Sequence, residues 1–133
     1  MMTIDYGARQ YQQTHVLTTS RVQLIVLLYD SAIQSLELAC EGMQNGKAEE
    51  KARFLGRAVA IVTELSNVLD FEKGGEIAQS LYRLYDYMLA ELLRANLRNN
   101  PRHLEGPLKC LVTLREGWQS LARQEASLAA AGK

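Results

Sequence analysis

Apolar residues recur every three or four positions along most of this chain. That spacing places side chains on one face of an α-helix, and no stretch sustains the period of two that a half-buried β-strand requires. The apolar stripes comprise Val22, Ile25, Tyr29, Ala32, Leu36, Ala39 and Met43; Leu55, Ala58, Val62, Leu65 and Leu69; Ala78, Tyr82, Tyr85, Leu89, Leu92 and Asn96; and Leu104, Pro107, Leu111, Leu114, Trp118 and Leu121. The pattern therefore predicts an all-α protein with four helices.

Residues that start or stop helices lie between these stretches. Ser20 and Gln23 have the spacing of a capping box, which would open the first helix. Asn45-Gly46 is typical of a helix C-terminus. Gly74-Gly75 is predicted to separate the second and third helices, because glycine tolerates the backbone of a tight turn. Asn99-Asn100-Pro101 is predicted to end the third helix, since the residue before proline is disfavoured in the α region.

The fourth helix has two possible starts. It begins either at Pro101, with a distortion at Pro107, or at Pro107 after a short turn. Short connections between helices of about 20 residues favour antiparallel neighbours. We therefore expect an antiparallel up-down four-helix bundle over residues 20–126, with a flexible N-terminal arm over 1–19 and a disordered tail over 127–133.

The first and third helices are apolar on more than one side. The residues that widen their stripes are Leu24, Leu27 and Leu28, and Leu81, Leu84, Met88 and Leu93. A surface helix needs an apolar band of only about 100° or slightly more. The excess indicates either burial on several sides or an exposed binding surface. Burial is the favoured interpretation for each residue taken singly.

The net charge and the length of the apolar runs argue against nucleic-acid binding and membrane insertion. Fifteen basic residues balance fifteen acidic ones, so the chain lacks the overall basic footprint of nucleic-acid binding. The row Arg94, Arg98 and Arg102 is interpreted as a solvated helix edge. The longest apolar run, Leu24 to Tyr29, is too short to span a bilayer, and residues 1–20 contain no apolar signal-peptide core. We expect neither nucleic-acid binding nor membrane insertion.

The residues that usually carry catalysis are sparse. Neither His15 nor His103 has an acidic residue three positions before it, as the ligands of di-iron bundles do. No P-loop or GxGxxG motif is present. Cys40 and Cys110 are interpreted as reduced thiols on apolar helix faces. The sequence therefore predicts a cytoplasmic protein that is not an enzyme and needs no metal or cofactor.

Three segments near the third helix strongly resemble the flagellin export chaperones of the FliS type: Glu72 to Ala78, Leu84 to Met88 and Leu92 to Asn99. The resemblance extends from about residue 6 to residue 121. Further matching positions are Tyr11-Gln12-Gln13, Leu24-Ile25, Leu28-Tyr29-Asp30 and Trp118. The chain departs from the family at Arg21, where a proline usually follows the serine, and at Gly106-Pro107, which is unlike the family's usual run into the last helix.

The resemblance implies a chaperone that binds the C-terminal segment of flagellin in the cytoplasm, prevents premature polymerisation and supports export through the flagellar secretion apparatus. An amphipathic client helix docking on an apolar surface requires no nucleotide. Contact with the export apparatus and a homodimer of the client-free protein stay open as further interactions. The alternative function is a helical adaptor or phosphotransfer domain in bacterial signalling.

The predicted client-binding residues fall into two groups. Those of the arm are expected to cover apolar surface until a client displaces them, whereas those of the first and third helices are expected to contact the client directly. The first group is Tyr6, Ala8 and Tyr11; the second is Leu24, Leu27, Leu28, Leu81, Tyr87 and Met88. In contrast, Tyr85 is predicted to pack in the core with its hydroxyl bonded to a partner, and Trp118 to anchor the last helix.

Overall fold

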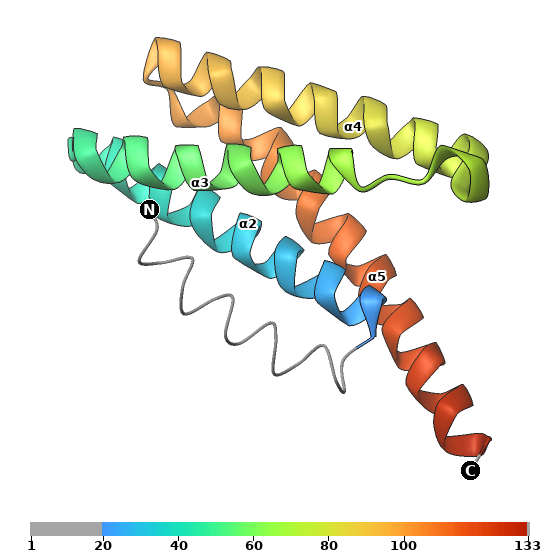
Figure 1. The fold of residues 1–133 in the computed structure, drawn as a ribbon. Coiled ribbons are helices and arrows are strands. Elements are labelled where there is room, and N and C mark those ends of the chain that lie inside the picture. Colours follow the sequence, from blue (N-terminus) through green and yellow to red (C-terminus); the bar gives the residue numbers. More distant parts are fainter. Residues whose placement is uncertain (1–19, 133) are drawn as a thin grey trace.

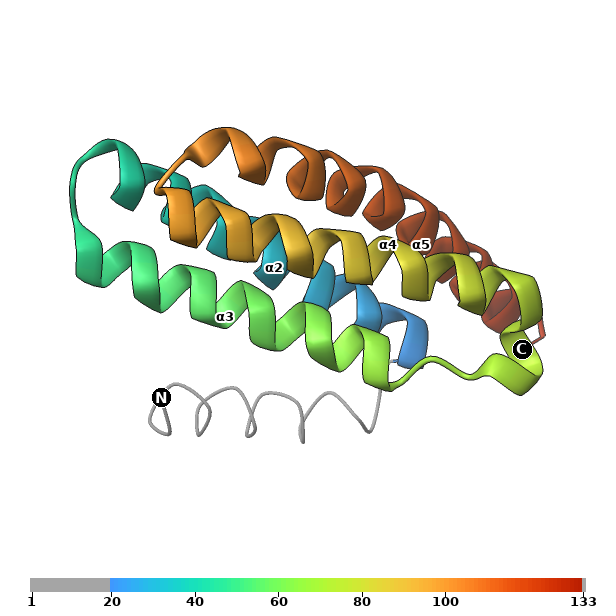
Figure 2. The ribbon, with the colours of Figure 1, turned by 90° about the horizontal axis from the view of Figure 1, so that it is seen from above.

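The computed structural model describes residues 20–132 and consists of helices (Figure 1). The elements are α2 (Arg21–Gln44), α3 (Ala48–Asn67), α4 (Phe71–Arg98), the 3-10 helix η1 (Pro101–Leu104) and α5 (Glu105–Ala131). Within residues 20–132 there is no β-strand. Successive α-helices run in opposite directions, as both views of the ribbon show (Figures 1 and 2). The predicted antiparallel four-helix bundle is confirmed.

The four helices form a ring in which each packs on its neighbours in sequence. α2 packs against α3 and α5, and α3 also packs against α4, so that α2 and α4 face one another across the core. The pair α4 and α5 is the least closely packed. These two helices meet where η1 joins them and separate toward their other ends (Figure 1).

Small residues bring α2 and α3 close together. A Cβ atom added to Gly42 would lie 2.9 Å from the backbone nitrogen of Lys51, so the two backbones touch at this point. Because the helices are antiparallel, steps of seven residues bring Ser35 beside Ala58, and both are fully buried. The Ser35 hydroxyl donates to the Ser31 carbonyl at 2.8 Å, which satisfies this buried polar group. The beginning of α2 therefore lies beside the end of α3.

The predicted capping box opens α2. The Gln23 backbone N–H donates to Ser20 Oγ at 3.1 Å, and the Ser20 N–H donates to Gln23 Oε1 at 3.3 Å. At the other end, Asn45 caps the helix, and Gly46 follows with a positive φ of 67°. A positive φ is readily adopted by glycine. Both predicted boundaries of this helix are confirmed.

The predicted helix break at Gly74-Gly75 is present, but it falls within α4 and not between α3 and α4. α3 ends at Asn67, and α4 already begins at Phe71. The Asp70 carboxylate accepts from the backbone N–H groups of Glu72 and Lys73 at 3.1 and 3.0 Å, which stabilises this earlier helix start. Gly75 instead forms a kink inside α4, with φ 51° and ψ −124°.

Each predicted start of the last helix is met in part, because a 3-10 turn begins at Pro101 and α5 itself begins two residues before Pro107. Asn99 has a left-handed conformation with φ 48°, η1 follows from Pro101, and α5 begins at Glu105. Pro107 lies in the first turn of α5, where a missing N–H group breaks no intrahelical hydrogen bond. The C-terminal tail also differs from expectation, because α5 continues to Ala131. Its last residues are rich in alanine, which has the highest helix propensity.

Two tyrosines join α2 to α4 in the core. The hydroxyls of Tyr29 and Tyr85 lie 2.5 Å apart, and both side chains are almost completely buried. Burial raises the pKa of both phenols above the ordinary value of 10.0. The ring of Trp118 lies 6.5 Å from that of Tyr29. The core position and bonded hydroxyl predicted for Tyr85 are confirmed, and Trp118 packs against the core while staying partly exposed.

We expect Tyr29→Phe to lower the free energy of unfolding by about 1–3 kcal/mol, because the Tyr85 hydroxyl is left buried without its partner. The double substitution Tyr29→Phe/Tyr85→Phe should restore much of this loss, since it removes both polar groups together. Urea denaturation of the wild type, both single variants and the double variant measures the coupling free energy between the two hydroxyl groups. A double variant that loses the sum of the two single losses would contradict the pairing.

Candidate binding surface

The beginning of α2 presents apolar side chains outside the core. Leu24 and Leu28 are partly buried, and Leu27 keeps 36% of its surface exposed. The end of α3 lies alongside and adds Ile61, which is partly buried, and Val68, which is 42% exposed. We call Leu24, Leu27, Leu28, Ile61 and Val68 the α2/α3 strip. An apolar strip on two packed helices is a suitable contact surface for an amphipathic helix.

Sequence reasoning missed Ile61 and Val68. Both lie off the main stripe of their helix and are seven residues apart, so they share one side of it. The same signal identified Leu24, Leu27 and Leu28 on the first helix. Apolar residues off the main stripe of α3 would have identified Ile61 and Val68 in the same way. The antiparallel register of α2 and α3 was needed to show that these residues adjoin the α2 leucines.

Two of the predicted client-binding residues belong to the core. Met88 is completely buried, and Leu81 is 8% exposed. Both lie on the side of α4 that faces the other helices, together with Tyr85 and Leu92. The apolar excess of α4 is therefore explained at these two positions by burial, and neither side chain is available to a client in this arrangement.

Tyr87 lies outside the core, where α4 meets α5. Its side chain is 43% exposed. The hydroxyl lies so close to Gly106 that a Cβ atom at position 106 would clash with it. Glycine at 106 therefore gives Tyr87 the space to lie across the first turn of α5. The remaining predicted residues, Tyr6, Ala8 and Tyr11, lie outside the described residues.

Two polar contacts bridge neighbouring helices. Asp30 of α2 accepts from Arg115 of α5 at 2.9 Å. At the corner between α4 and η1, the Glu91 carboxylate bonds to His103 Nδ1 at 3.0 Å and accepts from Arg94 at 2.5 Å. The hydrogen bond from His103, and secondly that from Arg94, lower the pKa of Glu91 below 4.5. His103 is thus engaged at a helix junction, whereas a phosphotransfer histidine would be exposed midway along a helix.

The lowered pKa of Glu91 predicts a pH dependence of stability. A carboxylate with a lower pKa in the folded state stabilises the fold above its unfolded pKa, and this contribution is lost as the pH falls through the folded value. We expect the wild type to lose stability as the pH falls below 4.5, and His103→Ala to show a weaker dependence there. Denaturant unfolding from pH 6 to pH 3 tests this. Parallel profiles would contradict a role for the Glu91–His103 contact.

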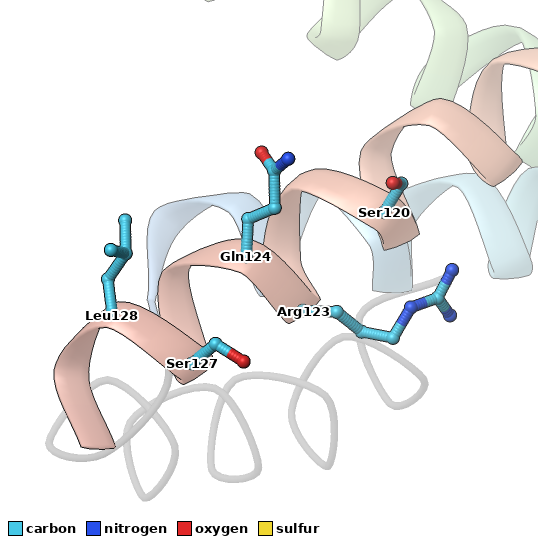
Figure 3. A pocket seen from close by; sticks show the side chains of 5 residues that line it. All are labelled: Ser120, Arg123, Gln124, Ser127 and Leu128. Carbon is cyan, nitrogen blue, oxygen red and sulfur yellow. The ribbon is translucent and has the colours of Figure 1, made fainter. Parts of the chain in front are cut away.

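An open depression on α5 has no set of polar groups that point toward one centre. Its described lining is Ser120, Arg123, Gln124, Ser127 and Leu128. These side chains project from successive turns of one helix (Figure 3). Ligand sites usually combine a concave apolar wall with polar groups that point toward one centre. Over residues 20–132, no group of three or more His, Cys, Asp or Glu side chains could hold a metal ion.

By length and composition, α2 is the one helix of the described chain that is long and apolar enough to cross a membrane. Core helices of soluble proteins satisfy the same criterion. In this bundle, the apolar residues of α2 face α3, α4 and α5 or contribute to the α2/α3 strip. Its composition is therefore accounted for by helix packing and by the strip.

Comparison with known proteins places this bundle among flagellar proteins. A family model described as "Flagellar protein FliS" matches residues 4–125. The chain is 37% identical over 121 residues to the flagellar secretion chaperone FliS of Salmonella typhimurium, covering 87% of this chain and 90% of that protein. It is 34% identical over 118 residues to the flagellar secretion chaperone FliSB of Pseudomonas aeruginosa, covering 86% and 94%. The Bacillus subtilis chaperone FliS is 28% identical over 124 residues, covering 93% and 92%.

Proposed function

This chain belongs to the FliS family of flagellar secretion chaperones, and from that premise we propose that its client is flagellin, bound through the C-terminal segment. The protein is a chaperone of flagellar export. In our proposal it binds newly made flagellin in the cytoplasm, keeps it from polymerising, and delivers it to the export apparatus. The wider role follows from the family, and the identity of the client and the compartment are our inference.

The observation that supports this proposal is the exposed α2/α3 strip. Leu24 lies one turn before Leu27 and Leu28 on α2, and the core residues of the same helix anchor it in the bundle. A rigid apolar surface of this kind suits an amphipathic segment that folds on binding. The ordering of the segment reduces the net affinity, so that a large contact can still be released.

We also propose that the protein acts by binding and not by catalysis. The polar side chains that the bundle pairs, Asp30 with Arg115 and Glu91 with His103, connect one helix to the next. Such contacts orient the helices relative to one another. This arrangement favours a role in which binding energy alone protects the client.

The arm residues Tyr6, Ala8 and Tyr11 have a separate place in the proposal. Their apolar side chains would cover the α2/α3 strip until flagellin displaces them. Deleting residues 1–18 should then change client affinity and lower the stability of the free protein. If both quantities stay unchanged, the arm has no such role.

Calorimetric titration with the C-terminal peptide of the host's flagellin tests the proposed client. We expect one-to-one binding with a large negative heat-capacity change, because apolar surface is buried as the peptide folds. An absence of binding, with the bundle shown folded by circular dichroism, would overturn the assignment of flagellin as the client. A scrambled peptide of the same composition is the control for nonspecific apolar binding.

A further inference from the structure

Gly75 gives α4 a backbone conformation that other residues rarely adopt. Its φ is 51° and its ψ is −124°, inside a helix that otherwise runs from Phe71 to Arg98. Glycine enters the mirror image of the β region readily, whereas the Cβ atom of an L-residue meets steric conflict there. The first turn of α4 therefore leaves the line of the remaining helix (Figure 1).

The kink brings the first turn of α4 back toward the rest of the helix. The rings of Phe71 and Tyr82 meet edge to face, with centroids 6.0 Å apart and planes at 69°. In an unbroken helix these two residues would be three turns apart, about 16 Å along the axis, and their rings could not touch. A Cβ atom at Gly74 would lie 2.8 Å from Ala78 Cβ, although residues four apart in a regular helix have Cβ atoms about 5–6 Å apart. Both contacts therefore depend on the kink.

A short connection joins this first turn to the α2/α3 strip. Only Val68, Leu69 and Asp70 lie between α3 and α4. Leu69 packs against the core, whereas Val68 is exposed and belongs to the strip. The Val68 backbone N–H donates to the Glu64 carbonyl at 3.1 Å, so Val68 continues the last turn of α3. The end of the strip is therefore the start of the connection to α4.

The connection has little slack. Two residue steps join Leu69 to Phe71, they span at most about 7 Å, and Asp70 between them is already extended with φ −105° and ψ 99°. If α4 ran straight, Phe71 would move away from Tyr82 and out along the helix axis. The connection would then pull Leu69 from its place against the core, and Val68 would leave the strip with it. The position of Phe71 therefore determines the position of Val68.

We propose that Gly75 is a positioning residue for client binding: its kink holds Phe71 beside Tyr82 and thereby keeps Val68 on the α2/α3 strip. This inference rests on the proposed function, because the strip is the surface assigned to flagellin. Gly75 acts without touching the client. Its contribution is a backbone conformation that sets one end of the contact surface before the client arrives, and such preorganisation reduces the entropy lost on binding.

Gly75→Ala is the first test. L-Alanine disfavours the kinked conformation, so the first turn of α4 should leave its place, and calorimetric affinity for the flagellin C-terminal peptide should fall about fivefold or more. Gly117→Ala in α5 is the matched control, because Gly117 is exposed with no described atom within 4 Å of its Cβ position. The control should bind like the wild type. Wild-type affinity in Gly75→Ala would overturn the proposal.

Gly75→D-Ala separates the backbone conformation from the added methyl group. A D-residue adopts positive φ as readily as an L-residue adopts negative φ, so this variant should keep both the kink and the wild-type affinity. The full chain can be assembled from synthetic peptides by ligation at Cys40 and Cys110, with a synthetic wild type as reference. Equal weakening by the two alanine enantiomers would assign the loss to the methyl group and overturn the proposal.

A double-mutant cycle tests whether Gly75 acts through Val68. In a Val68→Ala background, Gly75→Ala should change affinity for the flagellin peptide by less than about twofold, because the side chain that it positions is already truncated. Losses that add in the double variant would show that Gly75 acts by another route, and they would overturn the proposal.

An NMR measurement on the free protein is independent of the client. A nuclear Overhauser contact between the rings of Phe71 and Tyr82 should be present in the wild type and in Gly75→D-Ala, and absent in Gly75→Ala. Its persistence in Gly75→Ala would overturn the positioning role, whichever client binds. If the wild type bound no flagellin peptide, the proposed client and the role of Gly75 in binding it would both be wrong, whereas the ring contact would still decide whether Gly75 sets the kink.

Discussion

Met88→Ala should lower the free energy of unfolding by about 2–5 kcal/mol, the range for truncating a large buried side chain. Met88 is completely buried on α4, in the same core cluster as Tyr29, Tyr85 and Leu92. Removing its side chain leaves a cavity that the packed helices fill only in part. Denaturant unfolding, monitored by circular dichroism, gives the change directly.

The conservative substitution Met88→Leu serves as the control. A swap of similar volume usually costs less than about 1.5 kcal/mol, so this variant should stay close to the wild type. If Met88→Ala were as stable as the wild type but bound the client more weakly, Met88 would be a contact residue, and its placement in the core would be wrong.

Leu27→Asp should weaken client binding and leave stability almost unchanged, which is the reverse of the result expected for Met88→Ala. Leu27 is 36% exposed on the α2/α3 strip, so an aspartate there should change stability by no more than about 0.5 kcal/mol. The affinity for the flagellin C-terminal peptide should fall by about 30-fold or more, corresponding to the loss of about 2 kcal/mol at an interface hot spot. Calorimetric titration, together with an unfolding curve of the same sample, measures both quantities.

Leu97→Asp is the matched control for Leu27→Asp. Leu97 is an exposed leucine near the C-terminal end of α4 and lies outside the α2/α3 strip. Its substitution should leave affinity for the flagellin peptide unchanged. Equal weakening of flagellin-peptide binding by both substitutions would contradict the assignment of the client to the α2/α3 strip.

Helix existence and most helix ends could be predicted because the determining contacts are local. The capping box of Ser20 and Gln23, the stop at Asn45-Gly46 and the end before Pro101 each depend on residues within one turn of the boundary. Predictions failed where two local signals competed. Gly74-Gly75 signalled a turn, but the Asp70 cap had already started α4, and the glycine pair became a kink. Pro107 signalled a break, yet it is tolerated in a first turn.

The candidate site was predictable only in part. Periodicity identified apolar residues in excess of one stripe, including Leu27 and Met88, but it could not separate those that face neighbouring helices from those that face solvent. Tyr87 was distinguished from Tyr85 correctly, because the two lie about 200° apart around one helix, and only one of them faces the core. Its position against Gly106 required the packing of α5.

The sequence by itself determined the helical class, the capping of α2, the core position of Tyr85 and, through the resemblance, the chaperone family. Only the tertiary structure decided that Met88 and Leu81 are buried and that Ile61 and Val68 join the α2 leucines. The physical reason is that periodicity reports the direction of a side chain relative to its own helix axis. Whether that direction leads into the core or into water depends on where the other helices pack, and residues distant in the sequence determine this.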